Sequence, residues 1–263
     1  MKLAVSNIAW EENLDEIIFD KMAQRGFRSL EIAPTRILPN SPYDQLEKAV
    51  SFQKKLQQDY GFSICSMQSI WFGRTESLFG SPSARDALLS YTKKAIDFAH
   101  AIHCRNLVFG CPKNRSIPPN GDINIAISFF REIAAYAGSK NCVIGLEPNP
   151  PIYNTNFINT TLEALDLIKK INSPNFLLNL DLGTMIENDE KIEILQDAVP
   201  LISHIHISEP FLRTVQPRSL HQELKQLLEN NNYRGYVSIE MGKSEGAEQL
   251  IKTIEYVAAA FGP

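Results

Sequence analysis

The feature that most constrains the fold is a pattern repeated eight times along the 263 residues: a short apolar, β-branched run followed by a longer stretch with helical periodicity. The runs begin about 33 residues apart on average. They occupy residues 2–10, 29–34, 62–71, 106–111, 143–150, 176–185, 202–210 and 236–241. Repeated alternation of strand and helix predicts parallel strands joined by right-handed crossovers.

Eight such units in a chain of this length are typical of an α/β protein of one architecture, a single (β/α)8 TIM barrel. The rival architecture, an open doubly wound sheet, normally carries a glycine-rich phosphate turn after its first strand. Here that position reads AVSNIAW, residues 4–10, without a glycine. No linker, low-complexity segment or change in composition divides the chain. We therefore expect residues 1–263 to form one domain.

Charge and hydropathy narrow the function classes. The chain has 26 Lys and Arg against 30 Asp and Glu, a net charge of −4. This balance argues against general nucleic-acid binding, which uses a basic face. No apolar run approaches the ~20 residues of a membrane span, and the first residues lack the pattern of a signal peptide. We expect a cytoplasmic protein that binds neither nucleic acid nor membrane, and homo-oligomer formation is compatible with the sequence.

Metal-competent side chains end four consecutive strands, and barrel active sites are built at the C-terminal ends of the strands. The segments VIGLEPNP, LLNLDLGT, HIHISEP and VSIEM supply Glu147, Asp181, His206 and Glu240. His204 and His206 face the same side of their strand, because side chains alternate along a strand. His206 lies nearer the rim and is the better ligand, whereas we expect His204 to be a core histidine.

Three carboxylates at one barrel mouth would repel one another by several kcal/mol at low dielectric, and buried carboxylates require partners. The competing interpretation is ion pairing with Lys or Arg, but these four strand segments carry no basic residue. We therefore predict that Glu147, Asp181, His206 and Glu240 bind one divalent metal ion. Three carboxylates and one imidazole favour Mn²⁺, with Mg²⁺, Co²⁺ and Zn²⁺ also compatible.

The eightfold alternation, together with LEPNP, LDLG, HIHISEP and VSIEM, resembles the xylose isomerase-like TIM barrels over essentially the whole chain. That family comprises sugar phosphate isomerases and epimerases, and it shares a superfamily with the endonuclease IV type of DNA-repair nuclease. The resemblance implies the same four metal ligands and makes Glu147 and Glu240 the paired catalytic carboxylates. The chain departs from the family pattern at Thr184, where many members carry His, and at Leu212, where many epimerases carry Arg; Arg213 stands next to it.

The chemistry expected of such a site is proton transfer next to a carbonyl. A metal chelated by the carbonyl and the adjacent hydroxyl stabilises an ene-diolate, and a carboxylate removes the proton as general base. If Glu147 and Glu240 act on opposite faces, the carbon inverts and the reaction is epimerisation. If one group carries the proton between neighbouring carbons, the reaction is aldose–ketose isomerisation. We predict a metal-dependent isomerase or epimerase of a sugar or sugar phosphate, with both outcomes open.

Further residues near the strand ends are candidates for binding the carbohydrate. They are Glu31, Gln68, Trp71, Lys113, Arg213, His221 and Lys243. Lys113 and Arg115 form a basic pair that would suit a phosphate or carboxylate. Trp71 would serve as an apolar wall, or equally as core packing. Residues 242–246 either bind an anion at a helix N-terminus or simply place Ser244 as an N-cap.

Three other functions remain alternatives. A lyase such as a dehydroshikimate dehydratase uses the same enolate chemistry on this fold. An endonuclease IV-like enzyme binds several zinc ions and needs more His ligands than this chain supplies, because two of its five His residues, His100 and His103, fall on a predicted helix. A binding barrel without catalysis would have no need of all four metal ligands.

Overall fold

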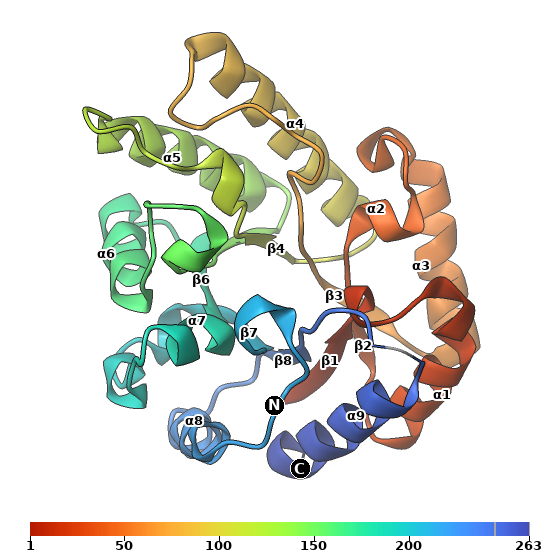
Figure 1. The fold of residues 1–263 in the computed structure, drawn as a ribbon. Coiled ribbons are helices and arrows are strands. Elements are labelled where there is room, and N and C mark those ends of the chain that lie inside the picture. Colours follow the sequence, from red (N-terminus) through yellow and green to blue (C-terminus); the bar gives the residue numbers. More distant parts are fainter. Residues whose placement is uncertain (245, 263) are drawn as a thin grey trace.

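The architecture is a closed barrel of eight parallel strands in sequential order, with β8 pairing back to β1 (Figure 1). It is seen in a computed structural model that describes residues 1–244 and 246–262. The strands are β1 (Lys2–Ser6), β2 (Ser29–Ile32), β3 (Ser63–Met67), β4 (Asn106–Phe109), β5 (Val143–Leu146), β6 (Phe176–Asp181), β7 (Ile202–Ile207) and β8 (Tyr236–Ile239). The predicted (β/α)8 fold is confirmed.

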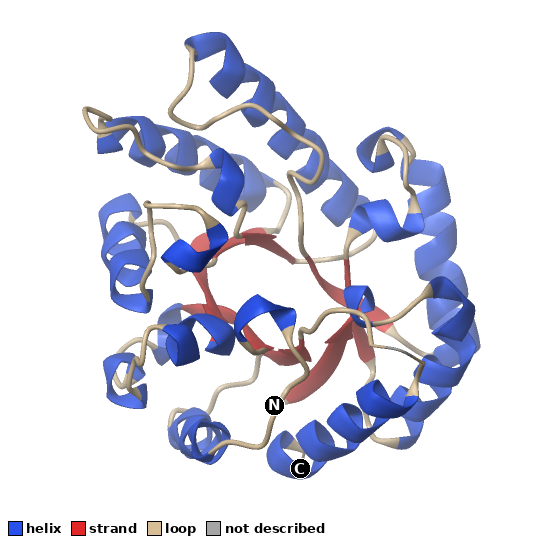
Figure 2. Cartoon of the chain, viewed as in Figure 1, coloured by secondary structure: helices blue, strands red, loops and turns tan. Residues whose placement is uncertain are grey.

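Helices surround the ring of strands (Figure 2). They are α1 (Asp15–Gln24), α2 (Pro34–Ile37), α3 (Leu46–Tyr60), α4 (Pro82–Ala101), α5 (Ile123–Ser139), α6 (Thr161–Ile171), α7 (Leu182–Glu187), α8 (Ser219–Asn230) and α9 (Glu248–Phe261). Among the described residues, no helix combines the length and the apolar character that crossing a membrane requires.

The predicted strand positions are accurate at their beginnings and too long at their ends. Seven of the eight runs begin at the first residue of the observed strand, and the third begins one residue before Ser63. Every run continues two to four residues beyond the strand. Most of the extra residues stay buried or partly buried, as Trp10 and Trp71 do. The buried segment therefore extends beyond the last residue that is hydrogen-bonded to the neighbouring strands, and an apolar pattern cannot mark where the strand ends.

The outward faces of the strands hold the helices in place through apolar packing. Phe130 of α5 lies with its ring centroid 5.0 Å from that of Phe109 in β4 and 5.0 Å from that of Phe176 in β6. All three side chains are fully buried. Burying an aromatic side chain of this size contributes roughly 1.5–3 kcal/mol. The hydrophobic core therefore lies between the barrel and its ring of helices.

The inward faces are unusually polar. Glu31 of β2 contacts His206 of β7, and these two strands are not neighbours, so the contact crosses the barrel interior. Asn106 of β4 donates a hydrogen bond to Ser66 of β3 at 3.0 Å. Side chains alternate along each strand, so every second residue packs against the helices and the residues between them supply polar groups to the interior.

Candidate active site

Four side chains from consecutive strands meet at the C-terminal mouth of the barrel. Glu147 directly follows β5, Asp181 ends β6, His206 lies in β7 and Glu240 directly follows β8. One potential ligand atom from each lies within 4.8 Å of the others. The Glu147 side chain is the most accessible of the four that were predicted, and it is only 12% exposed. The set predicted from the sequence is therefore one compact cluster.

His206 stands at the centre of this cluster. Its Nδ1 atom lies 3.0 Å from Oε1 of Glu147 and 3.1 Å from Oε2 of Glu240. The side chain of Asn179 donates to the same Glu147 oxygen at 2.9 Å and lies 3.3 Å from His206 Nδ1. Asn149 donates to the other Glu147 oxygen at 3.2 Å. Both oxygens of Glu147 are thus held by amides from the barrel.

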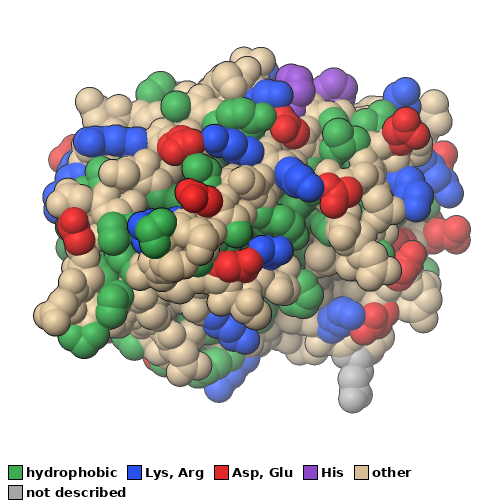
Figure 3. Space-filling view, turned by 90° about the horizontal axis from the view of Figure 1, so that it is seen from above, with side chains coloured by type: hydrophobic (Ala, Val, Ile, Leu, Met, Phe, Trp, Pro, Cys, Tyr) green, Lys and Arg blue, Asp and Glu red, His purple; other side chains and the backbone are tan. Residues whose placement is uncertain are grey.

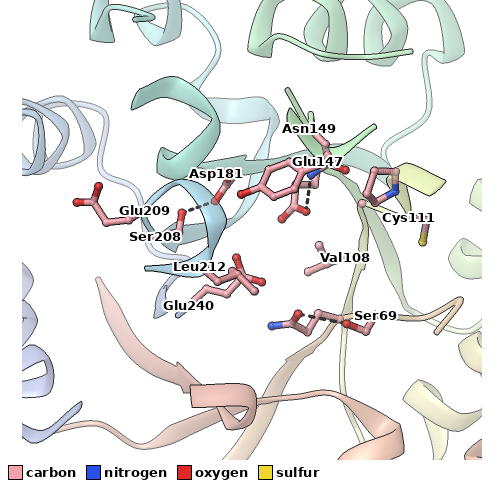
Figure 4. A pocket seen from close by; sticks show the side chains of 14 residues that line it. Ser69, Val108, Cys111, Glu147, Asn149, Asp181, Ser208, Glu209, Leu212 and Glu240 are labelled. Carbon is pink, nitrogen blue, oxygen red and sulfur yellow. Dashed lines mark hydrogen bonds between the residues drawn. The ribbon is translucent and has the colours of Figure 1, made fainter. Parts of the chain in front are cut away.

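Asp181 is held through both of its oxygens. Its Oδ2 accepts from the backbone N–H of Thr184 at 2.7 Å, and the Thr184 hydroxyl lies 2.8 Å from the same oxygen. That hydroxyl is also 2.8 Å from the carbonyl oxygen of Pro148, so it has two acceptors for one proton. The Ser208 hydroxyl donates to Oδ1 (Figure 4). Thr184 therefore has a definite role at the position where the resemblance leads one to expect His.

Gly110, directly after β4, leaves the space that Glu147 occupies. A Cβ atom at this position would stand 2.5 Å from Oε2 of Glu147, well inside van der Waals contact. Any other residue would therefore push the carboxylate away from the cluster. No motif in the sequence marks this glycine as part of the site.

The electrostatics of the cluster indicate a shortage of positive charge. Burial raises the pKa of Asp181, and that of Glu240 to about 7, and repulsion from Glu147 adds to both effects. Burial by itself would lower the pKa of His206, but the carboxylates of Glu240 and Glu31 raise it well above its ordinary value. Three hard carboxylates and one imidazole are a donor set that suits a divalent cation, whose charge would offset the repulsion between the carboxylates.

The cluster opens into a cavity of about 210 Å³. Figure 4 shows Glu147, Asp181 and Glu240 around one space, with Leu212 beside Glu240. Gln68 and Tyr153 also line the cavity. The Tyr153 hydroxyl accepts a hydrogen bond from the backbone N–H of Phe211 at 2.8 Å, which connects the loops after β5 and β7. Among the described residues that line the cavity, none is Lys or Arg.

Several residues predicted to bind the sugar lie outside this cavity. Trp71 is 2% exposed, and its indole N–H donates to Thr92 at 2.8 Å, so its ring packs in the core beside the cavity. His221 is buried in the helix layer, with Nδ1 2.7 Å from the Tyr256 hydroxyl of α9. Glu31 is completely buried below the cavity and does not line it.

The basic candidates also point away from the cavity. Lys113 is exposed over a neighbouring groove, and Arg213 lies over the ring of Phe211, 5.3 Å from its centroid. Lys243 pairs with Glu11 at 2.8 Å on the surface. Arg115 is fully buried, and it donates to the carbonyl oxygens of two residues and to Asn149. The predicted basic pair for a phosphate is therefore not formed.

The predicted N-cap of the last helix is wrong. Helix α9 begins at Glu248 with Ala247 as its N-cap, and the Ser244 hydroxyl instead donates to the carbonyl oxygen of Gly246 at 3.2 Å. Glu245, within the segment predicted to bind an anion, lies outside the described residues. His204 is buried, as expected of a core histidine, with Nε2 3.0 Å from Oε2 of Glu31.

Two polar residues of the site had no place in the sequence prediction. Asn179 stands two residues before Asp181, and Asn149 stands two residues after Glu147. Along a strand, residues two apart face the same side. That spacing is the signal that could have identified Asn179, and it identifies Ser208, two residues after His206, in the same way.

The fold and the cluster together define a class: closed (β/α)8 barrels with a carboxylate–imidazole site at the mouth. Residues 19–259 match the family model described as xylose isomerase-like TIM barrel, and the chain belongs to that family. An L-ribulose 3-epimerase from Methylomonas sp. (strain DH-1) is 31% identical over 163 residues, which are 58% of this chain and 55% of that protein. The chain thus matches about half the length of this curated relative.

Solved structures show the same fold at lower identity. A crystal structure of D-psicose 3-epimerase in the presence of D-fructose superimposes with a TM-score of 0.79 at 18% identity, covering 100% of both chains. An AP endonuclease of family 2 from Brucella melitensis superimposes with a TM-score of 0.74 at 21% identity, covering 98% of this chain and 99% of that one. Likeness at this level establishes architecture, and function has to be argued from the site.

Proposed function

We propose that this protein is a metal-dependent sugar epimerase that acts on an unphosphorylated ketose. The observation that carries the proposal is the cluster of Glu147, Asp181, His206 and Glu240, which opens into a small cavity without basic residues among its described lining. Similarity to proteins described as L-ribulose 3-epimerase and D-psicose 3-epimerase supports inversion at carbon 3 of a ketose.

The four residues of the cluster would hold one divalent ion, with Mn²⁺ preferred because carboxylate oxygens outnumber the imidazole nitrogen. When bound, the ion would supply Lewis-acid polarisation of the sugar carbonyl and of the neighbouring hydroxyl. Asn179, Asn149, Ser208 and Thr184 keep the protein ligands in place by hydrogen bonds. Such support fixes the donor groups before the substrate enters.

Proton transfer would be the work of Glu147 and Glu240, which approach the cavity from β5 and β8. One carboxylate takes the proton from the carbon next to the carbonyl, and the electron pair of that C–H bond moves toward the carbonyl oxygen. The other group, as a carboxylic acid, returns a proton to the same carbon from the opposite face, which inverts it.

The charge of the cavity supports a neutral substrate. Four acidic residues line it: Glu147, Asp181, Glu209 and Glu240. The basic residues of the surrounding loops are occupied or face away, including Arg218, which pairs with Glu209 at 2.5 Å. A phosphate dianion would be repelled here. The volume of about 210 Å³ is below the roughly 300 Å³ at which sites for drug-sized ligands begin, and this supports a monosaccharide.

A nuclease is less well supported. On the face of the molecule in Figure 3, lysine and arginine side chains are interspersed with aspartate and glutamate, without a continuous basic tract. The chain as a whole carries a net charge of −4. Binding to a nucleic-acid backbone relies on clustered positive charge.

The decisive first experiment is elemental mass spectrometry of the metal content of the wild type and of Glu240→Gln. We expect about one divalent ion per wild-type chain and weaker retention in the variant, because the amide carries no charge. Lys113→Met is a matched control outside the cavity and should retain the metal. Two or three zinc ions per chain would favour a nuclease, and no binding with added Mn²⁺ would contradict the proposal.

Turnover is then tested in deuterium oxide with L-ribulose, D-fructose and their phosphates. We expect the free ketoses to yield the C3 epimer with one deuterium at that carbon, and the phosphates to react far more slowly. A product that is lighter than the substrate by one water molecule would instead identify a dehydratase. Transfer of the carbonyl to the neighbouring carbon would identify an aldose–ketose isomerase.

A further inference from the structure

We propose that Glu31, predicted from the sequence to contact the sugar, is instead a positioning residue that determines which nitrogen of His206 faces the metal site. This inference rests on the metal site of the proposed function. Oε2 of Glu31 lies 3.0 Å from Nε2 of His206, and both side chains are completely buried. Glu31 does not line the cavity, so a sugar bound there cannot reach its carboxylate.

The two nitrogens of the His206 ring face different groups. Nε2 points to Glu31, whereas Nδ1 lies 3.0 Å from Glu147 and 3.1 Å from Glu240, within the metal-competent cluster. A neutral imidazole carries its single proton on one nitrogen only. Carboxylates face both nitrogens, but the two at Nδ1 belong to candidate metal ligands. Once an ion occupies that cluster, Glu31 is the acceptor that remains for the ring proton, which places the proton on Nε2 and leaves the lone pair of Nδ1 for the metal. Removing a carboxylate that fixes a metal-binding histidine in this way commonly weakens metal binding by about 10–100-fold.

Glu31 is itself held in one orientation. Its Oε1 accepts from Nε2 of Gln68 at 3.2 Å, and the same Gln68 nitrogen lies 2.6 Å from the Ser6 hydroxyl. His204 approaches Oε2 with its Nε2 at 3.0 Å. Gln68 follows β3 and is itself held by Ser6 of β1, and His206 lies in β7, so contacts from separate parts of the barrel fix the carboxylate. A buried carboxylate with partners on both oxygens cannot rotate without leaving one of them unpaired.

A second metal ion is the competing explanation for this part of the interior. Potential ligand atoms of Glu31, His204 and His206 also lie within 4.8 Å of one another. However, Nε2 of His206 forms a hydrogen bond with Oε2 of Glu31 at 3.0 Å, whereas Nε2 of His204 lies at the same distance from that oxygen without hydrogen-bond geometry. A proton on Nε2 of His206 accounts for its contact with Glu31 without another ion.

The first test reads the His206 ring directly. Full-length protein with nitrogen-labelled histidine is loaded with Zn²⁺, and long-range proton–nitrogen spectra assign the ring nitrogens, with a His206→Gln sample identifying the signals. We expect Nδ1 to bind the metal and Nε2 to carry the proton. Metal bound through Nε2, or a second zinc ion per chain, would overturn the inference. This measurement needs no Glu31 variant and does not depend on turnover.

The second test measures Mn²⁺ affinity by calorimetry. Glu31→Gln keeps the size of the side chain but can accept through one of its two terminal atoms only. We expect Mn²⁺ to bind about 10–100-fold more weakly. Ser29→Ala is the matched control, because Ser29 lies two residues away on the same strand and its hydroxyl contacts Ser63 at 3.0 Å. The control should stay within about twofold of the wild type.

Loss of the fold and loss of metal affinity can be told apart in these variants. Thermal unfolding checks each variant, and Glu31→Asp, which keeps the charge on a shorter side chain, should also weaken Mn²⁺ binding. Affinity of a folded Glu31→Gln equal to that of the wild type would overturn the inference and leave the proposed function standing. Conversely, Mn²⁺ binding that depends on Glu31 in a protein without ketose turnover would overturn the proposed function and leave the inference standing.

Discussion

Thr184 contacts one carboxylate oxygen of Asp181 twice: the backbone nitrogen of Thr184 lies 2.7 Å from Oδ2, and the Thr184 hydroxyl lies 2.8 Å from the same atom. Thr184 is fully buried in the first turn of α7, directly after the strand that Asp181 ends. The turn of backbone that begins the helix thus also orients a ligand of the candidate metal site. Local chain geometry and the chemistry of the site are coupled at this point.

Thr184→Val should separate the two contacts, because valine keeps the shape and the backbone N–H but lacks the hydroxyl. We expect the free energy of unfolding to fall by about 1–2 kcal/mol and Mn²⁺ to bind a few-fold more weakly. Urea denaturation and calorimetry measure the two effects. Thr161→Val is the control, since Thr161 is equally buried and its hydroxyl has no partner among the described residues. Equal losses in both variants would contradict the assigned role.

Gly110→Ala should damage the site more than the fold. The added Cβ would stand 2.5 Å from Oε2 of Glu147, and the flexible carboxylate would yield before the strand does. Misplacement of a reacting group by about 1 Å can cost on the order of 100-fold in rate. We expect a loss of that order in kcat, weaker Mn²⁺ binding, and a melting temperature close to that of the wild type. Unchanged kcat would show that Glu147 is not needed in its observed position.

Arg115→Met and Lys113→Met form a pair that tests what the basic residues after β4 do. Arg115 is fully buried, and its guanidinium donates to the carbonyl oxygens of Glu147 and Ile158 and to Asn149. Burial lowers the pKa of Arg115 to about 10, so it stays charged at neutral pH. Replacing Arg115 would leave three acceptor oxygens without their hydrogen-bond donor, and we expect the free energy of unfolding to fall by about 3 kcal/mol.

Lys113→Met should change neither stability nor turnover of a free ketose appreciably, because the Lys113 side chain is exposed and faces a different groove. Guanidinium chloride denaturation compares the two variants. A large loss of activity toward phosphorylated sugars in the Lys113 variant alone would revive the phosphate-binding role predicted from the sequence.

His221 should make stability depend on pH. Burial lowers its pKa to about 4, against about 6.5 in an unfolded chain. Between these values the unfolded chain binds a proton that the folded chain does not, so the free energy of unfolding decreases as the pH falls. This destabilisation by His221 is absent above about pH 6.5 and lowers the free energy of unfolding by at most about 3 kcal/mol near pH 4.

Denaturation of wild type and His221→Gln across this pH range isolates the effect, because the variant lacks the titrating ring. The stability difference between the two proteins should shrink or reverse in favour of the variant as the pH falls. His100→Gln, at an exposed position, is the control and should leave the slope unchanged. A parallel pH dependence in all three proteins would contradict the assignment to His221.

Much of the fold follows from the order of residues along the chain. Alternation of apolar runs and helical stretches is a local property, so it gave the beginnings of the strands nearly without error. The positions of Glu147, Asp181 and Glu240 at strand ends, together with the closed topology, made their convergence predictable. The strand ends were misplaced because residues such as Trp10 remain buried beyond the ladder.

The sequence by itself determined the barrel, the end of it that carries the site, and the four side chains that meet there. Only the tertiary structure decided which charged residues face the cavity. Glu31 and Arg115 both follow the pattern of rim residues, yet both are fully buried and bonded elsewhere. The physical reason is that periodicity fixes the side of a strand on which a residue lies, whereas its depth and its partners depend on how distant strands close the barrel.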